Sequence, residues 1–259
     1  MLDFCVLGSG SSGNASVIRT QNTMILIDAG FSALRLKKKL EELRIGLESI
    51  SAILLTHEHT DHSQALGQIT KKYKIPVMGT RHTCMYLKEK APNASWINFE
   101  KGSSFQIGDI TVMPFATSHD AVDPVGFRMA TTDGTLGFLS DTGCCNTAIA
   151  RSLEHVDALY IESNYDPHLL ETTPKRPWPL KQRIASRHGH LSNQQAAEFV
   201  EQIAHDGLRH IILGHLSGES NTEEIAMETM ARTITRTGFS DTTLSCSRQH
   251  EILPWISVG

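Results

Sequence analysis

The chain has 259 residues, of which 40% are hydrophobic and 20% are charged, and its formal net charge is −4. These values exclude a disordered or fibrous protein and disfavour a globally basic nucleic-acid-binding protein. No apolar run approaches the roughly 20 residues that span a bilayer, and no basic residue precedes Arg19, as a secretory signal would require. The five cysteines form no Cys-x-x-Cys pair, which is typical of free thiols. We therefore expect a cytoplasmic protein that does not bind a membrane.

The first half of the chain predicts short strands that alternate with helices. Apolar runs between turn residues predict strands at residues 4–7, 15–19, 24–27, 51–55 and 77–78. Apolar residues at helical spacing predict helices at residues 32–43, 62–73 and 80–89. A loop of glycine, serine and asparagine, residues 8–14, follows the first strand.

The second half repeats this alternation. Strands are predicted at residues 105–107, 110–115, 125–131, 135–139, 158–161 and 210–213. Helices are predicted at residues 193–205, where Ser192 is a suitable N-cap, and at residues 222–235. No linker or low-complexity segment interrupts the pattern, which therefore predicts a single α/β domain over residues 1–259, built as a layered sandwich.

The strand at residues 51–55 leads into a dense group of metal-binding residue types. His57 and His59 are two residues apart, so in an extended chain they point to the same side and can share one metal ion. Asp61 and His62 follow a bend and can reach a second ion. Imidazole and carboxylate suit zinc, manganese or iron. The alternative is a solvated polar loop without a ligand.

This segment resembles the His-x-His-x-Asp-His metal motif of the metallo-β-lactamase superfamily. The rest of the family pattern follows in the expected order: a strand and an aspartate at Asp28, and residues after later strands at His119, Asp141 and His215. The resemblance implies a four-layer αββα fold. It also implies two divalent metal ions per chain, either zinc or manganese, with iron as a further option.

The same resemblance implies a role for each of these residues. Asp28 would brace the metal-binding loop without binding metal. The two ions would share Asp141 as a bridging ligand. The first ion would be held by His57, His59, His119 and Asp141, and the second by Asp61, His62, His215 and Asp141.

The segment Gly189-His190-Leu191-Ser192 resembles an additional histidine motif in phosphodiesterases of the superfamily, such as the tRNA 3′-end ribonuclease Z. Together with residues 160–166, 181–184 and 216–222 it resembles the YycJ/WalJ branch of bacterial nucleases, which is linked to 5′-to-3′ exonuclease activity on DNA. The resemblance thus implies a dinuclear metal-dependent phosphodiesterase in which a metal-bridging hydroxide attacks phosphorus.

The catalytic residues implied by this resemblance are Asp61, His190 and Glu162. His190 would donate a proton to the leaving oxygen, and Glu162 would pair with His190. Asp61 would act at the catalytic centre besides binding metal. For Glu162, the alternative is a surface acid at the end of a strand.

Residues 172–197, here called the basic segment, contain no acid and run directly into Gly189-His190. Lys181 and Arg183 in this segment are candidates for binding the backbone of a nucleic acid, for which DNA is favoured over RNA. A solvated loop is an equally good interpretation. Further candidates for binding substrate are Ser12 and Asn14 in the glycine-rich loop, which is otherwise a simple turn, and Asn164.

Two other functions remain open at this point. A small-molecule phosphodiesterase or a glyoxalase-like thioester hydrolase would use the same seven ligands, but neither explains the histidine motif and the basic segment together. A binding module without activity would be expected to have lost ligands, whereas this chain has the full set. The sequence does not indicate an oligomeric state.

Overall fold

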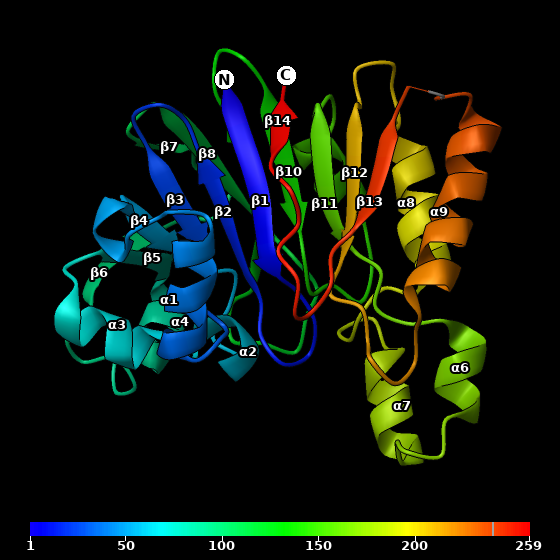
Figure 1. Cartoon of the computed structure of the whole chain (residues 1–259). Coiled ribbons are helices and arrows are strands. Elements are labelled where there is room, and N and C mark those ends of the chain that lie inside the picture. The colour runs from blue at the N-terminus through cyan, green and yellow to red at the C-terminus, as the bar shows by residue number, and fades with distance from the viewer. Residues whose placement is uncertain (240) are drawn as a thin grey trace.

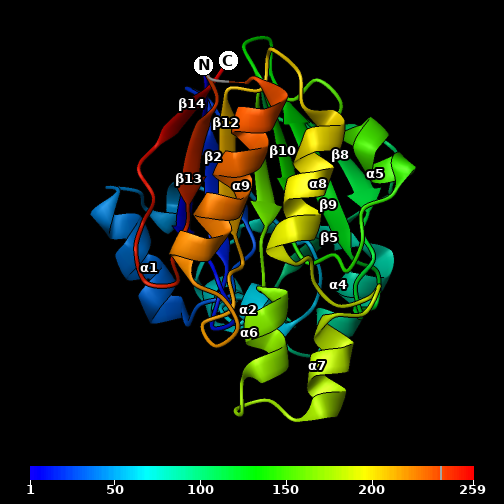
Figure 2. The same cartoon turned by 90° about the vertical axis from the view of Figure 1, so that its right-hand side faces the viewer.

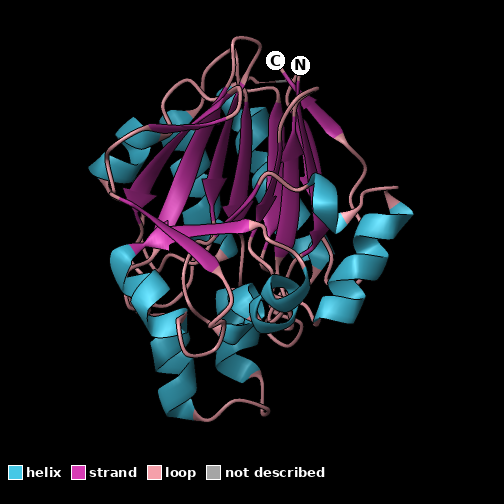
Figure 3. Cartoon of the chain, turned by 90° about the vertical axis from the view of Figure 1, so that its left-hand side faces the viewer, coloured by secondary structure: helices cyan, strands magenta, loops and turns pink. Residues whose placement is uncertain are grey.

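The computed structural model describes residues 1–239 and 241–259. Two seven-stranded sheets pack face to face, and helices cover the outer face of each sheet (Figure 1 and Figure 3). This arrangement confirms the four-layer αββα sandwich expected from the sequence. Within the described residues, no helix combines the length and the apolar character needed to traverse a bilayer.

The first sheet contains the N-terminal strands and, at one edge, the last strand of the chain. Its strand order is β14-β1-β2-β3-β4-β5-β6, and β3 to β6 run parallel to one another. The strands are β1 (Leu2–Gly8), β2 (Ala15–Arg19), β3 (Met24–Ile27), β4 (Ala52–Leu54), β5 (Pro76–Thr80), β6 (Ser95–Phe99) and β14 (Ile256–Val258).

The second sheet has the order β13-β12-β11-β10-β9-β8-β7, and its strands β10 to β13 are parallel. The antiparallel half consists of β7 to β10, in which β7–β8 and β9–β10 are hairpins that turn around Gly108 and Gly134. The strands are β7 (Phe105–Ile107), β8 (Ile110–Ala116), β9 (Val125–Ala130), β10 (Thr135–Leu139), β11 (Ala158–Glu162), β12 (His210–Gly214) and β13 (Thr243–Cys246).

Helices cover each sheet on the side that faces away from its partner. The first sheet is covered by α1 (Ala33–Glu42), α3 (Leu66–Lys72) and α4 (Arg81–Leu87). The second is covered by α5 (Thr147–Ser152), α8 (Asn193–Ile203) and α9 (Glu223–Thr237), of which α8 and α9 lie side by side in Figure 2. The short α2 (Thr60–Ser63) lies at the lower end of the sheets in Figure 1, opposite both termini.

The alternation of side chains along each strand produces these layers. In β1, for example, Phe4 and Val6 point into the core between the sheets, whereas Cys5 and Leu7 point towards the helices. All four are fully buried, because a strand covered on both faces has no solvent-exposed side. Phe138 and Tyr160 stack with ring centroids 4.4 Å apart in the core between the sheets.

The helix expected at residues 62–73 is interrupted, and α2 and α3 take its place. The carbonyl of Asp61 would have to accept from Ala65 in a continuous helix, but it accepts the backbone N–H of Asn14 at 2.8 Å. The N–H of Ala65 instead donates to the carbonyl of Ala29. Backbone groups of Asn14 and Ala29, in two other loops, thus bond the groups that a continuous helix would pair with each other. These bonds hold the turn at residues 57–62 in place.

The interpretation of the basic segment as a loop is wrong in part. The segment contains α7 (Trp178–Ile184). This helix packs beside α6 (Pro167–Thr172), and the two helices extend below the sheets in Figure 2. Pro177 and Pro179 argue for a loop in the sequence, yet proline is well tolerated in the first turn of a helix. A small cluster of Tyr165, Leu170, Leu180 and Ile184 holds the two helices together.

Candidate metal centre

The candidate site lies where the chain leaves the carboxyl ends of strands in both sheets. Asp28, Asp141 and His215 each follow such a strand closely and have positive φ angles of 58°, 49° and 54°. Aspartate and histidine are among the non-glycine residues found most often in this left-handed region. The three residues thus share an uncommon backbone conformation at the strand ends.

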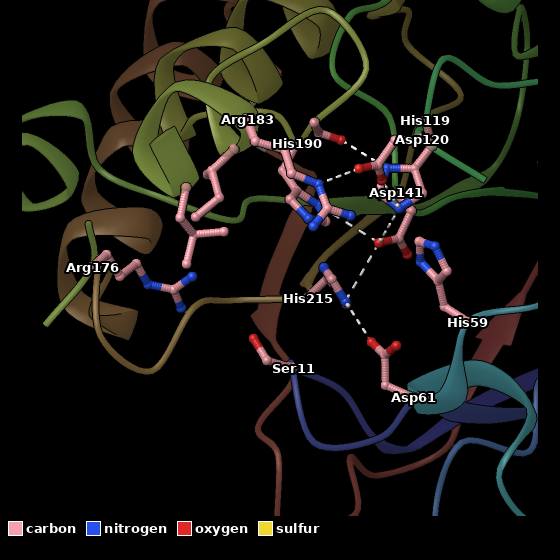
Figure 4. Close-up of a pocket in the computed structure, with 13 residues that line it drawn as sticks. Ser11, His59, Asp61, His119, Asp120, Asp141, Arg176, Arg183, His190 and His215 are labelled. Atoms are coloured by element: carbon pink, nitrogen blue, oxygen red, sulfur yellow. Dashed lines mark hydrogen bonds and ion pairs between the residues drawn. The ribbon is translucent and has the colours of Figure 1, made fainter. Parts of the chain in front are cut away.

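The loops bring together all seven residues proposed as metal ligands. Four groups of side chains have nitrogen and oxygen atoms that lie within 4.8 Å of one another; one joins Asp141 and His215 to Glu162 and His190, and the other three consist only of proposed ligands. They are His57 with His59 and His119, Asp61 with His62 and His215, and His57 with His62 and Asp141. The two sets predicted from the sequence therefore meet at Asp141, as Figure 4 shows for the part of the site that it draws.

Asp28 holds the turn of the metal motif from behind. Its Oδ1 accepts the N–H of Thr56 at 2.9 Å, and its Oδ2 accepts the Thr56 hydroxyl at 2.8 Å and Nδ1 of His62 at 2.7 Å. The opposite nitrogen of His62, Nε2, is then turned towards Asp141 at 3.2 Å and Asp61 at 3.4 Å. This geometry matches the bracing role that the resemblance implies for Asp28.

Asp28→Asn is expected to weaken metal binding by about 10- to 100-fold, because an amide no longer fixes the ring of His62 by its negative charge. The affinity for Zn²⁺, measured by competition with a chromogenic chelator, checks this prediction. Asp206→Asn, at an exposed acid far along the chain, serves as a control. Unchanged Zn²⁺ affinity in Asp28→Asn would contradict the role.

Two further histidines are oriented in the same manner. Nδ1 of His119 lies 2.9 Å from the carbonyl of Gly189, and Nδ1 of His215 lies 3.5 Å from Oε2 of Glu162, so each ring can donate its Nδ1 proton to an oxygen. In both rings the other nitrogen is left facing the carboxylate of Asp141. Anchoring one ring nitrogen in this way is how proteins orient a histidine ligand.

Burial and nearby charges lower the pKa of two histidines in the site and raise the pKa of two others. Burial and the nearby His62 hold the pKa of His57 well below its ordinary value, and burial also lowers the pKa of His119. Burial opposes protonation of His62 and His215 too, but Asp141 and neighbouring carboxylates outweigh it. They raise the pKa of His62 well above the usual range and that of His215 to about 10.

The carboxylates in the site stay ionised. Burial would raise the pKa of Asp141, yet His215, His62, His57 and His119 hold it well below its ordinary value. The pKa of Asp61 is likewise lowered by His62 and His215 against the effect of burial. A pocket that gathers ionised carboxylates is electrostatically suited to cations, which bind carboxylate ligands in their deprotonated form.

Two buried ring nitrogens are available to cations. Nε2 of His57 and Nε2 of His215 are buried, and within the described residues neither has a hydrogen-bond partner of good geometry. His215 Nε2 does lie 3.5 Å from oxygens of Asp61 and Asp141. An unsatisfied buried polar atom costs about 1–3 kcal/mol, and a metal ion bound to each nitrogen would remove that cost, so the residues present fit metal ions.

Two glycines allow the loops to come this close. A Cβ atom on Gly30 would lie 1.6 Å from the carbonyl of Asp61, inside the turn that carries the ligands. A Cβ atom on Gly189 would lie 2.1 Å from the carbonyl of Ile184, where the chain turns back from α7 towards His190. Any side chain at either position would displace a loop of the site.

Glu162 and His190 form the pair that the sequence predicts. His190 Nδ1 lies 3.0 Å from Glu162 Oε2, and Glu162 Oε1 accepts the N–H groups of Thr142 and Leu191. The interpretation of Glu162 as a surface acid is wrong, because it is fully buried. Burial would raise the pKa of Glu162, but His190 and His215 lower it, so the carboxylate stays ionised beside His190.

A cavity of about 170 Å³ opens over these residues, and α7 forms one of its walls. Arg183 from α7 lines it and pairs with the carboxylate of Asp120. Asp120 is not among the predicted site residues, although it directly follows His119 and lies 3.4 Å from Nε2 of that residue. Its position beside a predicted ligand was the signal that could have identified it.

The other predicted substrate-binding residues have different surroundings. Asn14 and Asn164 are buried and bond within the chain: Asn14 Nδ2 donates to the carbonyls of Gly10 and Asp61, and Asn164 Nδ2 donates to the carbonyl of His215. Both therefore brace ligands of the site. Lys181 is exposed to solvent in part, donates to the carbonyl of Glu171, and does not line the catalytic cavity.

Ser12 is exposed at the rim of the glycine-rich loop, in keeping with a role in binding. Ser9, in the same loop, is not among the predicted site residues. It is buried behind the site, where it contacts three other segments of the chain. The hydroxyl of Ser9 contacts Asn14 Oδ1 at 2.9 Å and the Tyr160 hydroxyl at 2.7 Å, and it accepts the N–H of His215 at 2.8 Å.

Comparison with known proteins agrees with this geometry. The beta-lactamase superfamily domain matches residues 23–215 of the chain. The exodeoxyribonuclease WalJ of Streptococcus pneumoniae serotype 2 is 36% identical over 88% of this chain and 86% of its own. The exodeoxyribonuclease YycJ of Bacillus anthracis is 32% identical over 92% of this chain and 91% of its own.

Solved structures show the same fold at much lower identity. The metallo-beta-lactamase fold protein YhfI of Bacillus subtilis superposes with a TM-score of 0.75 at 16% identity, covering 98% of this chain and all of that one. The resemblance first seen in the metal motif thus extends over the whole sandwich. The chain belongs to the beta-lactamase superfamily of metal-dependent hydrolases, in the family that includes WalJ and YycJ.

Proposed function

We propose that the chain is a dinuclear metal-dependent phosphodiesterase that degrades DNA as an exonuclease, in the 5′-to-3′ direction that the resemblance to the YycJ/WalJ branch implies. The names of the two relatives support DNA as substrate and attack at a strand end. The observation that carries the proposal is the meeting of two ligand groups at the single carboxylate of Asp141.

Each proposed ion would have its own ligand set. His57, His59 and His119 would hold one, Asp61, His62 and His215 would hold the other, and Asp141 would bind both. Two divalent cations held in this way would supply positive charge for the phosphoryl oxygens and would lower the pKa of an attacking water. Asp61 borders the cavity and is partly exposed, so it is also placed to orient that water.

His190 is the group that handles the departing oxygen. Its Nδ1 faces Glu162, so Nε2 is left to carry a proton towards the cavity that His190 lines. Glu162 fixes this orientation because its own oxygens are held by the backbone N–H groups of Thr142 and Leu191. The imidazole therefore needs little reorganisation when it donates the proton.

Arg183 and Arg176 line the same cavity and provide the charge that a phosphodiester requires. Arg183 is paired with Asp120, which keeps its guanidinium near His119. The reacting carbonyl of a thioester carries no anionic oxygen for these guanidinium groups to bind. The cations therefore favour a phosphodiester over a neutral thioester as substrate.

The proposal is tested with the purified chain supplied separately with Mn²⁺, Zn²⁺ and Fe²⁺. We expect metal-dependent release of nucleotides from the end of a labelled DNA strand, with slower or no cleavage of the matching RNA strand. Strands labelled at the 5′ and 3′ ends give the direction of degradation. Turnover of a glutathione thioester without cleavage of any strand would contradict the proposal.

A further inference from the structure

A second cavity adjoins the catalytic one and is larger. Its volume is about 660 Å³, and the two cavities share Ser11, Arg176 and Leu180 in their walls. We call it the side cavity. Figure 4 shows Arg176 and Ser11 on one side of the catalytic pocket, away from His59 and Asp120. A molecule bound over the metal ligands can therefore extend past Arg176 into the side cavity.

The side cavity is built from four parts of the chain that are distant in sequence. They are the glycine-rich loop, the start of the basic segment, the loop that follows β12, and the C-terminal segment before β14. Residues that line it include Ser11, Ser12, Lys175, Arg176, Leu216 and Arg248.

Hydrogen bonds between these parts preform the cavity. The N–H of Ser12 donates to Oε1 of Gln249 at 2.7 Å, and Nε2 of Gln249 donates to the carbonyl of Gly13 at 2.7 Å. Beneath them, the buried Lys39 donates to the carbonyls of Leu7 and His250. The glycine-rich loop is thus fixed to the C-terminal segment before any ligand arrives.

Charges in the side cavity are arranged for an anion. Glu219 pairs with Arg176 at 3.1 Å, and Glu223 pairs with Arg248. Lys175 is the lining cation for which no ion pair is found within the described residues. Arg248 also pairs with a second acid, Glu251, at 2.7 Å, so the positive charge open to an anion comes from Lys175 and from the free N–H donors of Arg176.

Arg176 lies where the two cavities meet, and some of its N–H donors are free to bind a ligand. Its Nε donates to Glu219, and one terminal nitrogen donates to the Ser217 hydroxyl at 3.3 Å. A guanidinium has five N–H donors, so three are left to bind a ligand from a fixed position. Ser11 and Ser12 are exposed and add hydroxyl groups, while Leu180 and Leu216 add apolar surface.

We propose that the side cavity is a nucleotide subsite that holds the phosphate and sugar of the nucleotide next to the scissile phosphodiester. The fixed guanidinium, the lysine and the serine hydroxyls bind the phosphate, and the leucines contact the sugar or base. This inference rests on the proposed function. The phosphate is either a terminal phosphomonoester or the next internal phosphodiester, and both offer the same anionic oxygens.

The test compares two substrates that differ in reach. Bis(p-nitrophenyl) phosphate contains a single phosphodiester and no second phosphate, whereas a DNA strand supplies the neighbouring nucleotide. Lys175→Ala is expected to lower kcat/KM for the strand about tenfold more than for the small diester. Ser12→Asp, which adds a carboxylate to the side cavity, is also expected to lower kcat/KM more for the strand than for the small diester. Lys88→Ala, at an exposed lysine after α4, is the matched control.

The ends of the strand identify the phosphate. If the subsite holds a terminal phosphate, Lys175→Ala removes a preference of the wild type for the 5′-phosphorylated over the 5′-hydroxyl strand. If it holds an internal phosphodiester, the variant slows both strands equally. Equal effects of Lys175→Ala and Ser12→Asp on the strand and on the small diester overturn the subsite. Absence of wild-type turnover of either substrate with metal overturns the proposed function itself.

Discussion

Asp141→Asn is expected to lower kcat/KM for phosphodiester hydrolysis by at least about a thousandfold while the chain remains folded. The carboxylate of Asp141 lies 3.2 Å from Nε2 of His62, 3.5 Å from Nε2 of His215 and 3.8 Å from Nε2 of His119. It is the one acid shared by both ligand sets, so its replacement affects both proposed ions at once.

Asparagine is the appropriate replacement because it keeps the size of the side chain and tolerates the positive φ of 49° at this position. The measurements are kcat/KM, metal content of the purified protein and thermal unfolding. Asp206→Asn, at an exposed acid, controls for the loss of one negative charge. A folded Asp141→Asn protein with two ions and full activity would show that this carboxylate does not join the sites.

The residues that meet in the candidate metal centre could be selected from the sequence because most of them are marked by a local feature. His57 to His62 form a continuous motif directly after β4, and Asp28, Asp141 and His215 each come directly after a short apolar strand. Strands that end at the same edge of their sheets bring such residues together whatever the details of the loops. The alternation of strands and helices in two halves predicted the α/β layered sandwich, and the family resemblance specified its four layers.

The walls of the cavities could not be predicted in this way. The α6–α7 pair is held by a cluster of only a few apolar residues, and its prolines are typical of a loop as well as of a helix start. Strand β14 is three residues long and is defined by its pairing with β1, at the opposite end of the chain. Nothing local marks such an element, because its stability comes from the partner strand.

The two buried asparagines show that the sequence does not indicate whether a polar side chain faces the cavity or the protein interior. Asn14 and Asn164 are polar residues in motif-bearing loops, where sequence reasoning favours contact with substrate. Whether a side chain of this kind faces the cavity or the protein depends on which carbonyls lie within reach after folding. Asn14 meets the carbonyl of Asp61, 47 residues away in sequence, and such contacts leave no pattern in the sequence.

His190→Ala is expected to slow cleavage of DNA by about 10²- to 10⁴-fold, the range that proton transfer from a positioned side chain contributes. The same variant should slow hydrolysis of bis(p-nitrophenyl) phosphate far less, because p-nitrophenolate is a weakly basic leaving group that departs without a proton. The deoxyribose oxygen that leaves from DNA is strongly basic and needs one. The measurement is the ratio of kcat/KM for the two substrates in the variant and in the wild type.

Metal content distinguishes a proton donor from a ligand at this position. His190 Nδ1 lies 3.5 Å from Asp141 Oδ1, and the ring belongs to a group with Glu162 and His215 that could itself hold a cation. A donor can be removed with both ions retained, whereas a ligand cannot. His188→Ala, at an exposed neighbouring histidine, is the matched control and should keep wild-type values for both substrates. If His190→Ala loses metal and slows both substrates equally, His190 binds a cation and the proton must come from another group.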